Sequence, residues 1–150
     1  MKRVAVAIAA SALVLGTSRG TAAPTVTLSV TPVSFSFPSG SPDTLPVSTG
    51  PTLTVRYSMS GGYFWDVWVL SVRAGGDLQS ASGSIPVGNI TWTAPYPLVG
   101  GTLSTTNQTL ATGQGNFLQR TGYVTFKLQN LWTYKTGSYS NTIIFTMAAP

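Results

Sequence analysis

The stretch GGYFWDVWVLSVRAGG, residues 61–76, decides the fold class, because two glycine pairs frame one long apolar segment. Counted in steps of two, one face of this segment carries Trp68, Leu70, Val72 and Ala74. The opposite face is also apolar for most of its length. Two apolar faces predict a central strand that is covered on both sides, or nearly so.

Asp66 lies inside this stretch, between Trp65 and Trp68, and has two interpretations. In the first, its carboxylate orients a sugar hydroxyl beside an aromatic platform formed by Tyr63, Trp65 or Trp68. In the second, it is a polar residue near the start of a strand, in contact with solvent or with an arginine. Alternation places Asp66 on the face of Trp68 and opposite Trp65, so the two tryptophans cannot clamp one ligand with it. We favour the second interpretation.

Other segments with a period of two predict further strands, separated by turns rich in Gly and Pro. They are residues 25–37, 52–60, 84–93, 122–132 and 137–150. Pro32 shifts the phase of the first segment, which predicts a bulge or a switch between sheets. We interpret residues 38–51 as a loop, because they are too rich in Pro, Gly and Ser for a central strand. Residues 102–115 indicate an edge hairpin or a long loop.

The fold class follows from these strands, because no window shows a capped pattern of helical period. We predict an all-β chain that forms an antiparallel, two-sheet, Ig-like β-sandwich of about seven strands. A small β-barrel is the alternative. The chain contains no cysteine, so packing and strand ladders must hold the sandwich together without disulfides.

The N-terminus has the layout of a secretory signal peptide. Lys2 and Arg3 precede an apolar run of 12 residues, and a stretch of small residues follows. Because a proline directly after the cut blocks cleavage, we place the cut after Ala22 rather than after Ala23. Residues 1–22 are then removed, and residues 23–150 form a single domain. The product is expected to be secreted or held at the cell surface, after periplasmic transit where an outer membrane exists, with no transmembrane anchor.

Composition excludes several classes of function. Without its leader the chain has five cationic side chains against three aspartates, a net charge of +2, and the cations are scattered. Nucleic-acid binding requires a basic stripe, which this pattern lacks. The chain has no His, Cys or Glu, so the common nucleophile and metal-ligand sets are missing. We therefore expect no catalytic residues, no cofactor, no metal site and no enzymatic activity, and we interpret Asp43 and Asp77 as turn residues.

Aromatic residues at strand ends allow one binding function. They either close the ends of the core or form an exposed platform that stacks against sugar rings. The candidates for such a platform are Trp92, Tyr96, Trp132 and Tyr134. The alternative function is therefore a carbohydrate-binding module.

The runs FWDVWVLSVRA, IPVGNITWT and GSYSNTIIFTMAAP resemble secreted bacterial surface β-sandwiches. The similar kinds are spore-coat-U-like and pilus-subunit proteins, and also WxL-type cell-wall domains. This resemblance implies a structural, fimbrial-like protein whose partners are copies of itself or other surface proteins. It also implies association by strand addition, in which a segment of one chain completes the sheet of another.

Under that resemblance the candidate donor strand is residues 25–37. Its alternating apolar side chains are Val26, Leu28, Val30, Val33, Phe35 and Phe37. The alternative is that this strand pairs within its own domain. The main expectation from sequence is an exported structural or surface-assembly protein without enzymatic activity.

Overall fold

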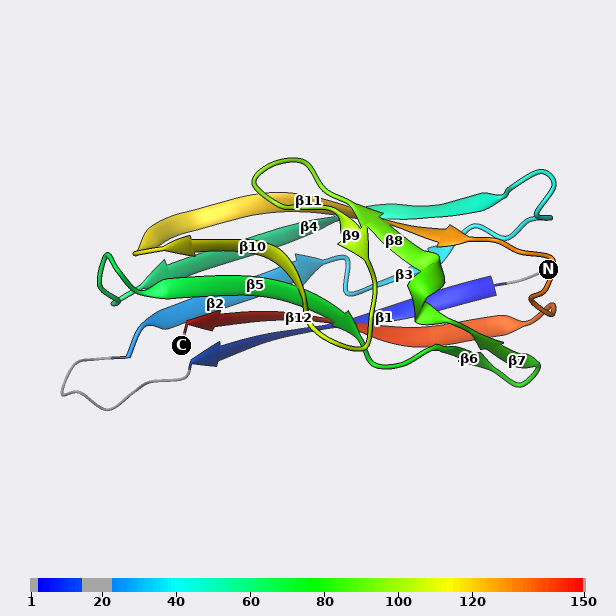
Figure 1. The fold of residues 1–150 in the computed structure, drawn as a ribbon, viewed down its shortest axis with the longest axis horizontal. Helices are drawn as coiled ribbons and strands as arrows, with labels where there is room; N and C mark the ends of the chain where they lie inside the picture. Colours follow the sequence, from blue (N-terminus) through cyan, green and yellow to red (C-terminus); the bar gives the residue numbers. More distant parts are fainter. Residues whose placement is uncertain (1–2, 15–22, 150) are drawn as a thin grey trace.

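A computed structural model describes residues 3–14 and 23–149 of the chain. These residues form two β-sheets packed as a sandwich, without an α-helix, and the sheets do not close into a barrel (Figure 1). The predicted all-β, two-sheet class is confirmed, and the barrel alternative is wrong. The described residues also contain no helix that is long and apolar enough to cross a membrane.

The strands are divided between a seven-stranded sheet, here sheet A, and a five-stranded sheet, here sheet B. Sheet A has the order β10 (Gln108–Gln114), β5 (Val67–Ala74), β12 (Ser138–Ala149), β1 (Arg3–Val14) and β3 (Ser34–Phe37). In addition, β6 (Leu78–Ser80) pairs with β12, and β7 (Gly83–Ile85) pairs with β6. Sheet B has the order β2 (Thr25–Thr31), β4 (Val47–Ser60), β11 (Phe117–Gln129), β8 (Ile90–Thr93) and β9 (Gly101–Thr102). One 3-10 turn, Val87–Asn89, precedes β8.

The predicted count of about seven strands is wrong, because the described residues contain twelve. One extra strand, β1, comes from the segment that the sequence assigns to the leader. Three others, β6, β7 and β9, are only two or three residues long, and propensity does not reveal such short ladders. The fifth, β10, lies within residues 102–115, for which an edge hairpin or a long loop is predicted. The ladder between β1 and β12 is also parallel, whereas the other described ladders are antiparallel, as predicted.

Pro32 marks a switch between the two sheets, as its phase shift predicts. Residues before it form β2, which pairs with β4 in sheet B. Residues after it form β3, which pairs with β1 in sheet A. A proline lacks the N–H that would continue the first ladder, so the chain leaves one sheet here and enters the other.

The strand that decides the fold is interior, as its two apolar faces predict: β5 lies between β10 and β12. Its inner face is fully covered, because Trp68, Leu70, Val72 and Ala74 are all buried. Its outer face is only half covered, and Val67 remains 39% exposed. One buried face and one half-covered face agree with the prediction of a central strand that is covered on both sides, or nearly so.

The interpretation of residues 38–51 as a loop is wrong for its last residues, because β4 begins at Val47. Pro51 is tolerated there for two reasons. The ladder with β2 covers only Thr54–Ser60, so Pro51 has no neighbour on that side. The ladder with β11 shifts its register next to this point, between Thr125 and Lys127, and such a bulge accommodates a proline.

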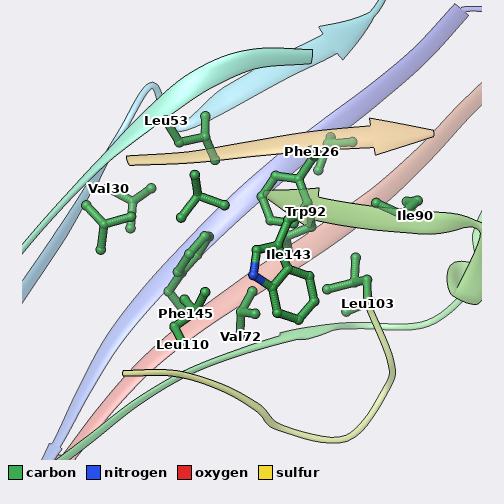
Figure 2. Packing of buried hydrophobic residues seen from close by; sticks show 14 of the residues in the cluster. Val30, Leu53, Val72, Ile90, Trp92, Leu103, Leu110, Phe126, Ile143 and Phe145 are labelled. Carbon is green, nitrogen blue, oxygen red and sulfur yellow. The ribbon is translucent and has the colours of Figure 1, made fainter. Parts of the chain in front are cut away.

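Side chains from both sheets meet in one core (Figure 2). Phe126 of β11 is the main link, because its ring centroid lies 5.9 Å from that of Phe35 in β3 and 6.3 Å from that of Phe145 in β12. Figure 2 shows Trp92 beside Phe126. The Trp92 ring lies on Gly101, where an added Cβ would come within 2.6 Å of it. This glycine is required for close approach.

Replacing Phe126 by alanine should destabilise the protein by about 3–5 kcal/mol, because the side chain is fully buried and links both sheets. Urea unfolding followed by tryptophan fluorescence measures this change. The matched control is Leu118→Ala, also on β11, whose side chain is 91% exposed and which should change stability by less than about 0.5 kcal/mol. Equal losses in both variants would contradict the assigned core.

Candidate functional site

The three aspartates lie in three separate turns, where each carboxylate accepts a hydrogen bond. The donors are the indole N–H of Trp132 for Asp43 (3.1 Å), the backbone N–H of Tyr63 for Asp66 (2.7 Å) and the backbone N–H of Val87 for Asp77 (2.8 Å). Across residues 3–14 and 23–149, no three acidic side chains gather where they would hold a metal ion. Asp66 and Asp77 therefore hold backbone N–H groups in place, whereas Asp43 holds the indole of Trp132.

Asp66 braces an exposed aromatic loop. Its carboxylate holds the N–H of Tyr63, and its carbonyl oxygen accepts the N–H of Gly115 at 2.9 Å. Tyr63 stacks on Trp65 with ring centroids 4.7 Å apart, whereas Trp68 is buried in the core. Trp65 and Trp68 thus lie in different environments, which supports the structural interpretation of Asp66.

The four candidate sugar-stacking residues do not share one platform. Trp92 is only 3% exposed, and its indole N–H donates to the carbonyl of Val99 at 2.8 Å, so it belongs to the core. Tyr96 is 96% exposed on the loop between β8 and β9. Trp132 and Tyr134 do come together, and line one groove of about 450 Å³ with the loop of residues 39–42.

An aromatic cluster fills one end of the core. Tyr57 of β4 is fully buried, with its ring centroid 5.8 Å from Trp68 and 5.6 Å from Phe117. The guanidinium of Arg120 lies 4.7 Å from the ring centroid of Phe117, at the distance of a cation–π contact. Burial raises the pKa of the Tyr57 hydroxyl above its usual value, and the charge of Arg120 opposes this rise.

The candidate donor strand, residues 25–37, is paired with other strands of the same chain. Its first part, β2, pairs with β4 from Thr25 to Thr31, and its second part, β3, pairs with β1. The side chains that it contributes to the core are Val26, Val30, Phe35 and Phe37, with Leu28 half-buried. Val33 is 70% exposed at the switch between the sheets.

β1 occupies an interior position that its assignment as a leader does not suggest. It lies between β3 and β12 and runs parallel to β12, with a continuous register from Arg3 opposite Ser138 to Val14 opposite Ala149 (Figure 1). Its ladder with β3 is shorter and antiparallel, from Val4 opposite Phe37 to Ala7 opposite Ser34. β1 therefore has a neighbour on each side only at residues 4–7. We call the space that β1 fills between β3 and β12 the slot.

The two faces of β1 differ in what they contact. Val4 and Val6 point into the core, where they are 4% and 1% exposed, and Ile8 is half-buried against it. Ala5 and Ala7 point outward into an open depression of about 640 Å³, lined mostly by small side chains of β3 and β12. The slot therefore constrains inward side chains and leaves outward ones free.

Sequence reasoning missed the slot because it removed residues 1–22 from the fold. The cleavage bond after Ala22 lies outside the described residues. One signal was present: Val4, Val6 and Ile8 alternate with Ala5 and Ala7, which is the period of a strand. An apolar run satisfies the requirements of export and of a strand at the same time, so composition alone does not distinguish them.

Comparison with known proteins adds no identification. No protein-family model matches the sequence, and no curated protein has a matching sequence.

The raised pKa of Tyr57 predicts a pH-dependent stability. Below about pH 10 the phenol is neutral in both states, but above it the unfolded chain ionises first, so the free energy of unfolding should fall as pH rises. Tyr57→Phe removes the ionisable group and should lose less stability between pH 9 and pH 11. Urea unfolding across this range measures both profiles. Parallel profiles for the two proteins would contradict the assignment.

Proposed function

We propose that this protein is an exported structural subunit of a cell-surface assembly, without enzymatic activity, which joins other chains by strand addition. One observation carries the proposal: the segment with the layout of a signal peptide is an interior strand of sheet A. Removing residues 1–22 would take away all of β1. The exported chain would then have an open slot that a strand from another chain can fill.

Loss of β1 would affect both of its neighbours. β12 would lose a ladder that runs along all twelve of its residues. β3 would lose its only strand partner among the described residues. Open backbone N–H and C=O groups on a long apolar edge are a template for pairing with another chain. Natural sheets usually cover such edges, so an uncovered one points to an interaction site.

Side-chain chemistry supports a structural role. The chain contains no His, Cys or Glu, and its three aspartates lie in separate turns, where each accepts a hydrogen bond from within the chain. A charge of +2 after export offers little electrostatic attraction for a charged partner. Backbone pairing and apolar burial are the interactions that remain for association.

The test starts from the full chain, with a protease recognition sequence in place of residues 15–22. After cleavage and removal of β1, the melting temperature should fall, because β12 and β3 lose their ladders. Added peptide RVAVAIAASALV, residues 3–14, should bind one to one and restore the melting temperature in a concentration-dependent way. Differential scanning calorimetry and fluorescence anisotropy measure the two effects.

The control is the same peptide with Val4 and Val6 replaced by aspartate. It should bind at least about 100-fold more weakly, because two unpaired carboxylates would enter the core. The proposal fails if the wild-type peptide does not bind the cut protein, or if removal of β1 leaves the melting temperature unchanged.

A second candidate function, carbohydrate binding, is favoured by the groove at Trp132. Trp132 is 68% exposed, yet its indole N–H is held by Asp43, so a flat ring is presented in a fixed position. Ser39, Ser41 and Thr136, which carry hydroxyl groups, line the same groove. An aromatic face beside neutral hydroxyl groups suits an uncharged sugar ring.

Titration of the full chain with chitobiose, cellobiose and maltose tests this function through tryptophan fluorescence. Trp132→Ala should weaken any binding at least about tenfold, because truncating a central tryptophan typically removes 2 kcal/mol or more. Trp65→Ala, which removes a tryptophan that is 55% exposed on a different loop, should leave it unchanged. No fluorescence change with any sugar, or equal loss in both variants, would exclude the groove.

A further inference from the structure

We infer that the natural occupant of the slot is a strand of a different protein, which runs parallel to β12 and carries aliphatic side chains at three alternate positions. This inference rests on the proposed function and specifies its partner. Two sets of observations support it. The contacts of β1 show which side chains the slot accepts, and the pairing of the other described strands shows whether any of them is free to donate.

The inward positions of the slot select aliphatic side chains of limited size. Val4 lies in register with Phe37 on β3 and with Tyr139 on β12, and both of these aromatic residues are buried. Val6 lies in register with Phe35. On the β12 side Val6 lies in register with Asn141, so aromatic rings flank Val4 on both sides and Val6 on one side. The strand between β3 and β12 contributes branched aliphatic groups that fill the remaining space.

Ile8 occupies the third position, at the end of the part of the slot that has both β3 and β12 as neighbours. β3 ends its ladder at Ala7, and the backbone N–H of Ile8 donates to the carbonyl of Val33 at 2.9 Å. Beyond it the occupant pairs with β12 alone, from Ala9 opposite Ile144 onward. Side-chain selection is therefore concentrated in the first half of the strand, and backbone pairing extends the contact along the second half.

Outward positions impose little selection. Ala5 and Ala7 face the open depression, whose other walls include Ser34, Ser36 and Ser140. None of these side chains is charged, so recognition there does not depend on charge. The partner segment is thus defined by three inward aliphatic residues and by its direction.

A second copy of this chain is a poor donor, although β2 has a matching pattern. Val26, Leu28 and Val30 repeat the spacing of Val4, Val6 and Ile8. However, β2 already pairs with β4 over seven residues and buries Val26 and Val30 in its own core. Moving β2 would fill one apolar slot and leave another empty, with no net gain in buried apolar surface.

The other described strands are also unavailable as donors to a second copy. β3 is a wall of the slot, and all other strands among residues 23–149 are paired within one of the two sheets. Because no described strand is free to donate, the complementary strand must come from a chain that this fold does not already use.

Direction and register are tested by disulfide formation with the protease-cut protein, since the chain has no natural cysteine. Peptide 3–14 with Ala5→Cys should cross-link to protein carrying Ser140→Cys, because Ala5 and Ser140 are register partners and both are exposed. The matched control is Thr146→Cys, the register partner of Ser11. We expect at least tenfold more cross-link at position 140 than at position 146, and the reverse preference would show antiparallel entry and overturn the inference.

Self-donation is tested by locking β2 in place. Thr27 and Ser58 are register partners whose hydroxyl oxygens lie 2.6 Å apart, so Thr27→Cys with Ser58→Cys should form a disulfide between β2 and β4. The locked and unlocked proteins should bind peptide 3–14 with affinities that agree within about twofold. Neither should form ordered oligomers without the peptide, as measured by light scattering.

Each outcome has a distinct meaning. Oligomers that form without peptide and disappear in the locked variant would make a second copy the donor, which overturns this inference and leaves strand addition intact. Absence of peptide binding in every variant would instead reject the proposed function itself. Using the cut full chain, which folds before β1 is removed, keeps the test decisive even if residues 23–150 do not fold alone.

Discussion

The ladder between β1 and β12 is the constraint on which sheet A depends. It joins the two longest strands of the sheet over their full length, and within residues 3–14 and 23–149 β3 is joined to the sheet only through β1. Without it, β3 would be held by side-chain contacts alone, chiefly the packing of Phe35 on Phe126. In a chain without disulfides, a ladder of this length is the main connection between the N-terminal and C-terminal parts of the sheet.

The same short segment satisfies two different physical requirements. Export requires an apolar run, and a central strand requires branched side chains at alternate positions. Val4, Val6 and Ile8 meet both requirements, because the alanines between them are apolar enough for the first and small enough for the second. A chain that loses this segment on export retains a slot shaped for such a strand. Export and assembly would thereby be linked by one sequence.

The sequence predicts the layers of this fold well, because its alternation is strong. The central position of residues 67–74 and the sheet switch at Pro32 are both confirmed. Strands that depend on pairing rather than on pattern are not predictable in this way. Examples are the two residues of β9, and β4 at Pro51, where the missing neighbour and the bulge become visible only in three dimensions.

For the candidate sites too, features set by local sequence are predictable and features set by the three-dimensional arrangement are not. Local sequence places aromatic residues at strand ends, but it cannot tell which ones converge. Trp92 lies against Gly101, far along the chain from Trp132, which faces a groove beside Tyr134. The slot is harder still, because it is formed by β3 and β12, which are separated by most of the chain. Such a site follows from topology, which residue spacing does not encode.

The low charge of the chain also determines how a partner strand would be recognised. Because no charged side chain among the described residues lines the depression beside β1, electrostatic steering would contribute little, and association rates would lie near the unsteered range of about 10⁵–10⁶ per molar per second. The lifetime of the complex must then come from the backbone ladder between the partner strand and the sheet, because each backbone pair has to open before the strand can leave. An interaction of this kind forms slowly and persists, and its affinity changes little with salt concentration. Those properties suit a permanent structural contact better than a transient one.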